Sequence, residues 1–258
     1  MISKGTSVQL FNYTITSSGL EKDVEYAYEL IKLGGHGRYM ACANPHSLVI
    51  AAQDPIFQRA LQNADILVPD GIGIVIGARV LGLPLRERVA GYEFFVGLLR
   101  HCSEMGGLSV YFLGSTNLIL ERIADRTRRD FPLLRLCGKF SPPFKSEFSE
   151  EENSRMIEAI NAANPAILWV GMTAPKQEKW IYQNRDRLNV PFIGAIGAVF
   201  DFYAGTKKRS SPMWQKLGLE WLPRFLREPQ RLWERNLKSI PIFLSWIFRE
   251  RMRQIFEA

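Results

Sequence analysis

Asp70 is the residue of this sequence whose type and setting most suggest chemistry. It stands in the segment Pro69-Asp70-Gly71, directly after the short apolar run Ile66–Val68. A carboxylate at such a point could take a proton from a hydroxyl group. It could equally cap a helix that begins near Gly73, because aspartate is a favoured capping residue. Both interpretations stay open on the residues alone.

Other apolar runs also end in small or polar residues. These endings are Cys42 to His46, Leu113 to Thr116 with Gly114, Val170 to Thr173, and Ile193 to Gly197. Each ending alone is an ordinary turn, because glycine and asparagine are common after a strand. If the runs are strands of one parallel sheet, the endings meet at one edge, where helix N-termini attract anions. Together they predict a rim that can accommodate phosphate groups.

The predicted rim also carries four polar residues, whose roles the residues alone do not decide. Asn44 could be a turn residue or could hydrogen-bond a phosphate through its side-chain amide. Gln177 and Glu178 open a predicted helix, where Glu178 is most simply a favourable charge in the first turn. Asp201 lies in the aromatic run Phe200 to Gly205. It needs a partner, which could be a ribose hydroxyl, a uracil edge or a protein donor.

The sequence lacks several well-known catalytic patterns. No GxGxxG motif opens a first strand–helix unit and no GxxxxGK[ST] loop occurs, so neither a nicotinamide dehydrogenase nor an ATPase is supported. The three histidines have no HExxH spacing, and there is no DxD pair to hold a divalent ion. Cys42 and His46 could suggest a thiol nucleophile and its base, but Pro45 between them and the lack of an orienting group argue against it. We therefore expect neither a metal nor a cofactor.

Alternating apolar runs and helical patterns must position these residues, and they predict an α/β fold with a mostly parallel sheet flanked by helices. The expected strands are Ser7–Asn12, Arg38–Ala43, Ile66–Val68, Ser109–Leu113, Leu133–Cys137, Ala166–Val170 and Pro191–Ile196. The expected helices span residues 21–33, 55–63, 73–82, 91–105, 116–130, 149–163 and 175–187. Ser149 and Glu152 form a capping box that marks the start of one of them.

The chain changes character after about residue 204. Residues 1–205 hold 21 basic and 21 acidic side chains, whereas residues 206–258 hold 12 and 5. The same tail holds four of the six tryptophans together with several phenylalanines, in helical patterns broken by prolines. Cationic and aromatic residues interleaved in this way suit a membrane surface. We expect residues 1–204 to form the α/β core and residues 205–258 a helical, membrane-facing appendage.

The chain is expected to work in the cytoplasm. Its longest apolar stretches fall short of the roughly 20 residues that a membrane-spanning helix needs, and its start has no signal-peptide pattern. Three cysteines without CxxC spacing favour a reducing compartment over a disulfide framework. The apolar face of the tail could also pack on another copy of the chain, so a homo-oligomer stays possible.

A series of motifs, taken in order, resembles the WecG/TagA/CpsF glycosyltransferases over residues 7 to 240. They are Asn44-Pro45, Ala64-Asp65 with Pro69 to Gly73, Arg88 to Gly91, Phe112 to Gly114, Gly171-Met172 with Pro175 to Glu178, Gly194 to Gly197 with Phe200-Asp201 and Ala204-Gly205, Gly218 to Leu222 with Arg224, and Glu228-Pro229 with Arg231. The resemblance implies a bacterial, metal-independent, inverting glycosyltransferase. Such an enzyme moves a hexose derivative, of the N-acetylmannosamine or glucose type, from a UDP-sugar to a polyprenyl-diphosphate-linked saccharide. It acts at the inner face of the cytoplasmic membrane, in the synthesis of cell-surface polysaccharide.

The resemblance also assigns roles to residues. Asp70 matches the catalytic base of the family. The expected donor-binding residues are Cys42, Asn44, Gly114, Gln177 and Asp201, and the expected acceptor and diphosphate residues are Arg88, Arg224, Arg231 and Arg235. Some members have a threonine where this chain has Cys42. Glu234 interrupts the basic run of the appendage, which leaves Arg235 as its third cation.

Two alternatives remain. A transferase of the same core chemistry could act on a soluble acceptor, with the tail as an oligomer contact. A nucleic-acid-binding protein could use the tail to follow phosphates and its aromatic rings for stacking. A net charge of +7 is small for that purpose, and a nucleic-acid-binding function would leave the rim around Asp70 unused. We therefore expect no nucleic-acid partner.

Overall fold

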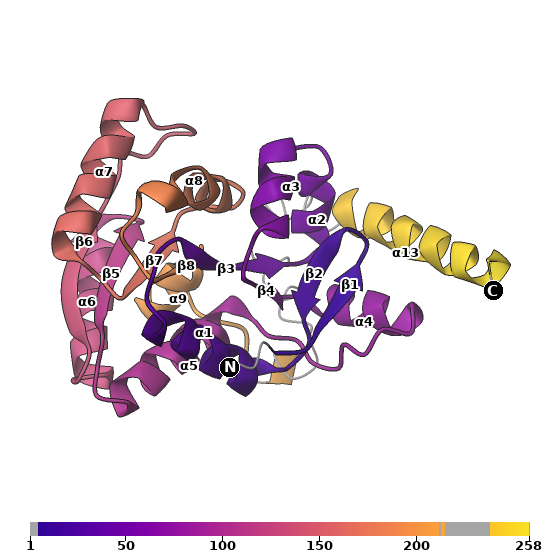
Figure 1. Ribbon diagram of the computed structural model, residues 1–258, viewed down its shortest axis with the longest axis horizontal. Helices are drawn as coiled ribbons and strands as arrows, with labels where there is room; N and C mark the ends of the chain where they lie inside the picture. Colours follow the sequence, from indigo (N-terminus) through magenta and orange to yellow (C-terminus); the bar gives the residue numbers. More distant parts are fainter. Residues whose placement is uncertain (1–4, 212, 215–237, 258) are drawn as a thin grey trace.

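The computed structural model describes residues 5–211, 213–214 and 238–257. Its centre is a six-stranded parallel sheet in the order β4-β3-β8-β7-β5-β6, with helices on both faces (Figure 1). The strands are β3 (Arg38–Ala43), β4 (Ile66–Pro69), β5 (Ser109–Gly114), β6 (Arg135–Phe140), β7 (Ile167–Gly171) and β8 (Phe192–Ala195). The expected α/β fold with a parallel sheet is confirmed.

The helices between the strands are close to those expected from the sequence. They are α1 (Leu20–Lys32), α2 (Pro45–Ala51), α3 (Pro55–Gln62), α4 (Ile72–Val80), α5 (Gly91–Glu104), α6 (Asn117–Asp130), α7 (Glu150–Ala163), α8 (Lys176–Asn184), the 3-10 turn η1 (Arg185–Arg187) and α9 (Val199–Tyr203). The capping box at α7 is present, because Ser149 N–H donates to Glu152 at 2.8 Å and Glu152 N–H donates to Ser149 at 3.2 Å. The short helices α2 and α9 were not expected.

Two apolar clusters cover the two faces of the sheet. One joins the sheet to α2, α3, α7 and α8, and the other joins it to α1, α5, α6 and α9. Side chains of β3 alternate between them, with Tyr39 and Ala41 in the first and Met40 in the second. Every residue of β5 and β7 is buried, which is typical of central strands of a parallel sheet covered on both sides.

The N-terminal segment forms a hairpin instead of one strand. The sequence led us to expect a strand over Ser7–Asn12, but β1 (Ser7–Leu10) ends earlier and β2 (Tyr13–Thr16) returns antiparallel to it. Phe11 at the turn has a φ of 56°, and its ring meets the rings of Phe243 and Trp246 edge to face. The bounds of the strand expected over Leu133–Cys137 also differ, because β6 begins two residues after Leu133 and runs to Phe140.

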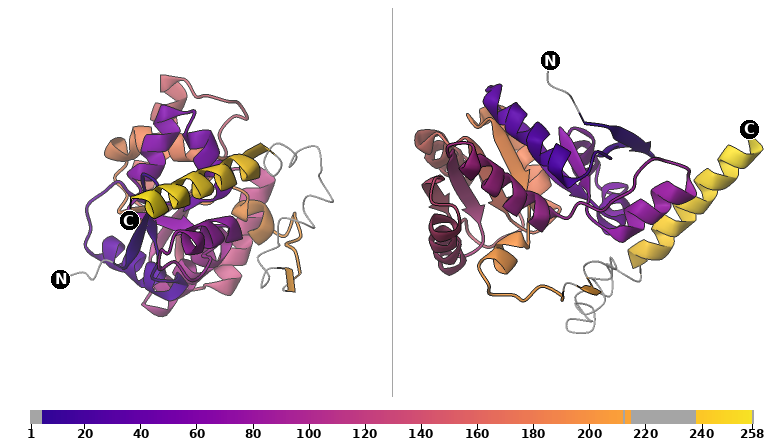
Figure 2. Two further views of the ribbon diagram at one scale, coloured as in Figure 1. Left: turned by 90° about the vertical axis from the view of Figure 1, so that its right-hand side faces the viewer. Right: turned by 90° about the horizontal axis from the view of Figure 1, so that it is seen from below.

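The last described helix, α13 (Ser239–Phe256), packs on the α/β core. It lies along α2 and α4, and both views in Figure 2 show it beside α4. Gly77 of α4 permits this approach, because a Cβ there would lie 2.8 Å from Ile247 Cδ1. Phe243 and Ile247 are 1% and 4% exposed and belong to the core cluster of this face. Phe243 is one of the phenylalanines of the tail that the sequence led us to expect at a membrane surface, and for this residue the expectation is wrong. The expected division at residue 204 stays a prediction.

Candidate active site

The strand endings that the sequence singled out do meet at one edge of the sheet. Ala43 of β3 pairs with Pro69 of β4, so the residues that follow them, Asn44 and Asp70, leave the sheet side by side. On the other side of β8, Gly114 of β5 pairs with Gly171 of β7. The carboxyl edge of a parallel sheet is where ligands bind in open α/β proteins.

Asp70 stands between the end of β4 and the start of α4. Its N–H donates to Val68 O at 3.0 Å, and the capping position of α4 is occupied by Gly71, which offers no side-chain cap. The capping role that the sequence left open therefore falls to the glycine. The carboxylate of Asp70 acts electrostatically on Cys42 in the neighbouring strand.

Arg88 is brought to the same corner by the chain that precedes α5. Val89 N–H donates to Pro69 O at 3.1 Å, which holds this loop against the end of β4. Arg88 is partly exposed there, one residue before that anchor. The start of α5 packs closely against the end of β3 at this corner, because a Cβ on Gly91 would lie only 3.1 Å from Cys42 Sγ. Arg88 and Asp70 are thus neighbours at the end of one strand.

The environment of Cys42 does not make it a nucleophile. Burial raises the pKa of its thiol well above the ordinary value, and the nearby carboxyl groups of Asp70 and Glu178 raise it further. A thiol with a raised pKa stays protonated at neutral pH and reacts slowly. His46 is engaged elsewhere, since its Nδ1 lies 2.8 Å from Ser239 Oγ at the start of α13. The structure agrees with the argument against a cysteine–histidine pair.

Asn44 is the N-terminal cap of α2. Its Oδ1 accepts from Ser47 N–H at 3.0 Å, and its own N–H donates to Ser47 Oγ at 2.8 Å. This arrangement is a capping box that uses the carbonyl end of the Asn44 amide. The N–H groups at the other end of that amide are not needed for the cap, so capping and ligand binding are compatible.

Gln177 and Glu178 form a buried polar pair at the start of α8, and each is 3% exposed. Gln177 Nε2 donates to Glu178 Oε1 at 2.8 Å, and Gly197 N–H donates to Gln177 Oε1 at 2.9 Å. Burial raises the pKa of Glu178 to about 7, with the hydrogen bond from Gln177 opposing the shift. Sequence reasoning missed this role of Glu178. Its spacing of three residues from the buried Ile181 was the signal that it lies on the inner face of α8.

Gly114 and Asp201 both have structural explanations. Gly114 has a φ of 120°, and a Cβ there would lie 2.5 Å from Gly171 O, so close packing of β5 and β7 requires the glycine. Asp201 accepts from Lys207 Nζ at 3.2 Å and is 3.5 Å from Thr206 Oγ1. The protein donors that the sequence allowed for Asp201 are therefore present. The donor-binding roles of both residues stay predictions.

The remaining expected site residues lie in the appendage. Arg224, Arg231 and Arg235 fall outside the described residues. Within the described ranges, no group of three His, Cys, Asp or Glu side chains is arranged to hold a metal ion. None of the described helices has the length and apolar character of a membrane span.

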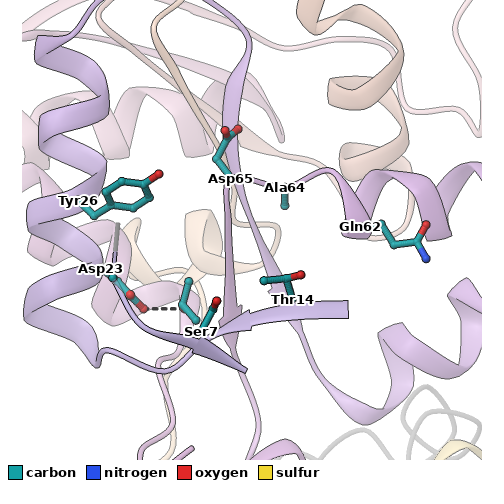
Figure 3. A pocket seen from close by; sticks show the side chains of 9 residues that line it. Ser7, Thr14, Asp23, Tyr26, Gln62, Ala64 and Asp65 are labelled. Carbon is teal, nitrogen blue, oxygen red and sulfur yellow. Dashed lines mark hydrogen bonds between the residues drawn. The ribbon is translucent and has the colours of Figure 1, made fainter. Parts of the chain in front are cut away.

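A small polar cavity of about 120 Å³ lies away from this site. Its lining includes Asp23 and Tyr26 of α1, Thr14 of the hairpin and Asp65, as Figure 3 shows. Asp65 precedes β4 and accepts from Tyr39 N–H at 2.9 Å, so the cavity opens at the amino ends of the strands. The carboxylate at the opposite edge, Asp70, is the one that shares a corner with Arg88.

The fold and the rim define the class of protein. An open parallel sheet with an acid, an arginine and several helix N-termini at its carboxyl edge is typical of α/β proteins that bind an anionic ligand at that edge. Comparison with known proteins gives the family: the model of the glycosyl transferase WecG/TagA/CpsF family matches residues 8–256, and the chain belongs to that family. The protein is therefore a glycosyltransferase, as its motifs led us to expect.

Curated relatives are similar over most of their length. A protein of Bacillus spizizenii (strain W23) is 30% identical over 213 residues, which cover 83% of this chain and 79% of the relative. A protein of Staphylococcus aureus (strain MW2) is 26% identical over 215 residues, covering 83% and 81%. Both relatives are named N-acetylglucosaminyldiphosphoundecaprenol N-acetyl-beta-D-mannosaminyltransferase.

Proposed function

We propose that this glycosyltransferase moves a hexose of the N-acetylmannosamine type from a UDP-sugar to a saccharide linked to polyprenyl diphosphate, in cell-surface polysaccharide synthesis. The names of the two relatives supply the sugar and the lipid-linked acceptor. A β-linked product from an α-linked nucleotide sugar corresponds to inversion. The observation that carries the proposal is the corner that Asp70 and Arg88 form at the end of β4, beside Asn44.

The chemistry needs one base and one site of positive potential. The acceptor hydroxyl oxygen attacks the anomeric carbon while the bond from that carbon to the β-phosphate oxygen breaks, and its electron pair leaves with UDP. Asp70 accepts the hydroxyl proton. A carboxylate is a weak base at neutral pH, so it takes the proton late, as the new bond forms. We assign to Arg88 the role of supplying positive charge for the leaving diphosphate, together with Arg224, Arg231 and Arg235 as their sequence motifs imply, and we expect no metal to take part.

Replacing Asp70 with Asn tests this role. The amide keeps the size of the side chain but cannot accept the proton, and we expect turnover to fall by about 10²–10⁴-fold. Binding of the UDP-sugar, measured by calorimetry, should stay within a few fold of the wild-type value. Asp65→Asn, at the opposite edge of the sheet, is the matched control and should keep wild-type turnover. A rate near that of the wild type in Asp70→Asn would refute the role of Asp70 as base.

The acceptor class is tested by the choice of substrate. UDP release should require N-acetylglucosamine linked to polyprenyl diphosphate, and a water-soluble sugar without the lipid should support little of it. Equal rates with both acceptors would favour the alternative of a soluble acceptor.

We also infer that the described end of the appendage lies on the membrane that holds the acceptor. Leu244, Phe248 and Ile255 of α13 are 52%, 66% and 54% exposed, and their spacing of four and seven residues places them on one flank with Arg251. On the adjacent helix α4, Ile76 and Val80 are 48% and 47% exposed. Exposed apolar side chains beside arginines suit an interface with anionic lipid.

Vesicle sedimentation tests this surface without removing the helix, whose inner face is part of the core. The double variant Phe248→Ser and Leu244→Ser should lose binding to vesicles that contain phosphatidylglycerol and should keep its fold. Phe144→Ser is the control, because Phe144 is fully exposed near β6, at the other end of the sheet. Unchanged sedimentation of the double variant would contradict the membrane role. Loss of a dimer in the same variant would assign the surface to self-association instead.

A further inference from the structure

Glu178 is a buried carboxyl group that the proposed reaction does not use. It is 3% exposed, and its Oε1 accepts from Gln177 Nε2 at 2.8 Å. Among the described residues its other oxygen, Oε2, has no hydrogen-bond partner although it is buried. A buried polar atom without a partner is costly in a folded protein and calls for an explanation.

The orientation of the Gln177 amide follows from its two hydrogen bonds. Its Oε1 accepts from Gly197 N–H at 2.9 Å, and its Nε2 donates to Glu178. The reverse orientation would set the NH2 group against the N–H of Gly197, which cannot accept. An amide nitrogen carries two hydrogens. Within the part of the chain that the structure describes, only one of them is used.

The pair lies in the middle of the rim. Gly197 follows β8, the strand between β3 and β7, and therefore lies between the endings at Asn44 and Gly171. Glu178 and Asp70 both act electrostatically on Cys42 at the end of β3. Gln177 and Glu178 thus belong to the same end of the sheet as the proposed base.

Within the described ranges, few charged groups lie near enough to Glu178 to change its ionisation. Tyr39 and Cys42 of β3 lie within its electrostatic range, and both are themselves held protonated by burial. Arg185 lies over the ring of Tyr39, and Lys179 of α8 is paired with Asp54 of α3 at 2.8 Å. Burial is the largest influence on Glu178 and favours the neutral acid.

We propose that Glu178 is a positioning residue for the donor: it fixes the Gln177 amide so that the second Nε2–H is held ready for an oxygen of the diphosphate of the nucleotide sugar. The proposal rests on the proposed function. As the neutral acid, Glu178 also places no negative charge beneath that diphosphate. Ionised Glu178 would still accept from Gln177, but its charge would repel the donor.

Two substitutions separate these contributions. Glu178→Gln keeps an acceptor for Gln177 and cannot ionise, whereas Glu178→Met has a similar size and offers neither acceptor nor charge. The matched control is Asp23→Asn, because Asp23 is a carboxyl group of 1% exposure at the opposite edge of the sheet, with a pKa that burial raises to about 6.

The probe is UDP-N-acetylmannosamine, whose esterified diphosphate keeps its charge between pH 6 and 8.5. We expect Glu178→Met to raise its Kd and KM about tenfold, the effect of losing one hydrogen bond, with a smaller change in kcat. In the wild type both constants should rise with pH above about 7. Glu178→Gln should resemble the wild type at pH 6 and show no such rise, and Asp23→Asn should follow the wild type throughout.

The outcomes distinguish this proposal from the proposed function. If the wild type neither binds nor turns over the probe, the proposed function fails. If the wild type is active and Glu178→Met binds the probe as tightly, only the positioning role fails. If Glu178→Met does not fold, the pH profile of Glu178→Gln decides, and a rise equal to that of the wild type would overturn the proposal.

Discussion

The raised pKa of Glu178 predicts a specific pH dependence of the stability of the ligand-free protein. Burial moves this pKa from an ordinary value of 4.5 to about 7. The folded protein therefore keeps a proton that the unfolded chain releases between these values. The unfolded state binds fewer protons in that interval, so the free energy of unfolding falls as pH rises through it and levels off above pH 7.

The magnitude follows from the size of the shift. Each pKa unit corresponds to about 1.4 kcal/mol, so the loss between pH 4.5 and pH 8 is about 3 kcal/mol. Glu178→Gln does not titrate and escapes this loss. The difference in unfolding free energy between the variant and the wild type should therefore grow in favour of the variant by about 2.5 kcal/mol from pH 5 to pH 8.

Urea unfolding at pH 5, 6, 7 and 8 measures this difference, provided that the dependence on urea concentration stays the same. Asp23→Asn is a useful comparison, because the pKa of Asp23 is raised from 3.8 to about 6 and its transition should lie at lower pH. A constant difference between Glu178→Gln and the wild type from pH 5 to pH 8 would refute the assignment of Glu178 as a buried acid.

Two further predictions concern the core and the thiol. Phe243→Ala should destabilise the protein by about 3–5 kcal/mol in urea unfolding, because this ring is 1% exposed against the hairpin. Phe248→Ala, on the exposed side of the same helix, should change stability by about 0.5 kcal/mol or less; equal effects would contradict the packing of α13. Iodoacetamide at pH 7.5 should modify Cys42 at least about tenfold more slowly than glutathione, because its pKa is raised, as mass spectrometry would measure. Modification as fast as that of glutathione would contradict the environment described for Cys42.

Much of the rim was predictable from the sequence. Asn44 and Asp70 each follow a short apolar run, and parallel strands end at one edge, so their proximity follows once the runs are identified as strands. The capping box at α7 was predictable because it depends on residues only three apart. Patterns that depend on neighbouring residues can be identified from the sequence without knowledge of the fold.

The features that the sequence did not reveal depend on contacts between distant segments. Phe243 belongs to an aromatic and basic tail of the kind that lies on membranes. It is buried only because α13 approaches Gly77 and Phe11. Glu178 has the appearance of a first-turn charge, and its burial depends on the packing of α8 against β8. The hairpin was missed because the positive φ at its turn falls on Phe11, a bulky residue, where a glycine is the usual signal of a turn.

A crystal structure with a bound UDP-sugar tests the central claim most directly. It should place the diphosphate at the carboxyl edge of the sheet, with the Asp70 carboxylate facing the anomeric carbon and the Gln177 amide near a phosphate oxygen. A nucleotide bound in the polar cavity beside Asp23 and Asp65, with Asp70 remote from the sugar, would contradict the account.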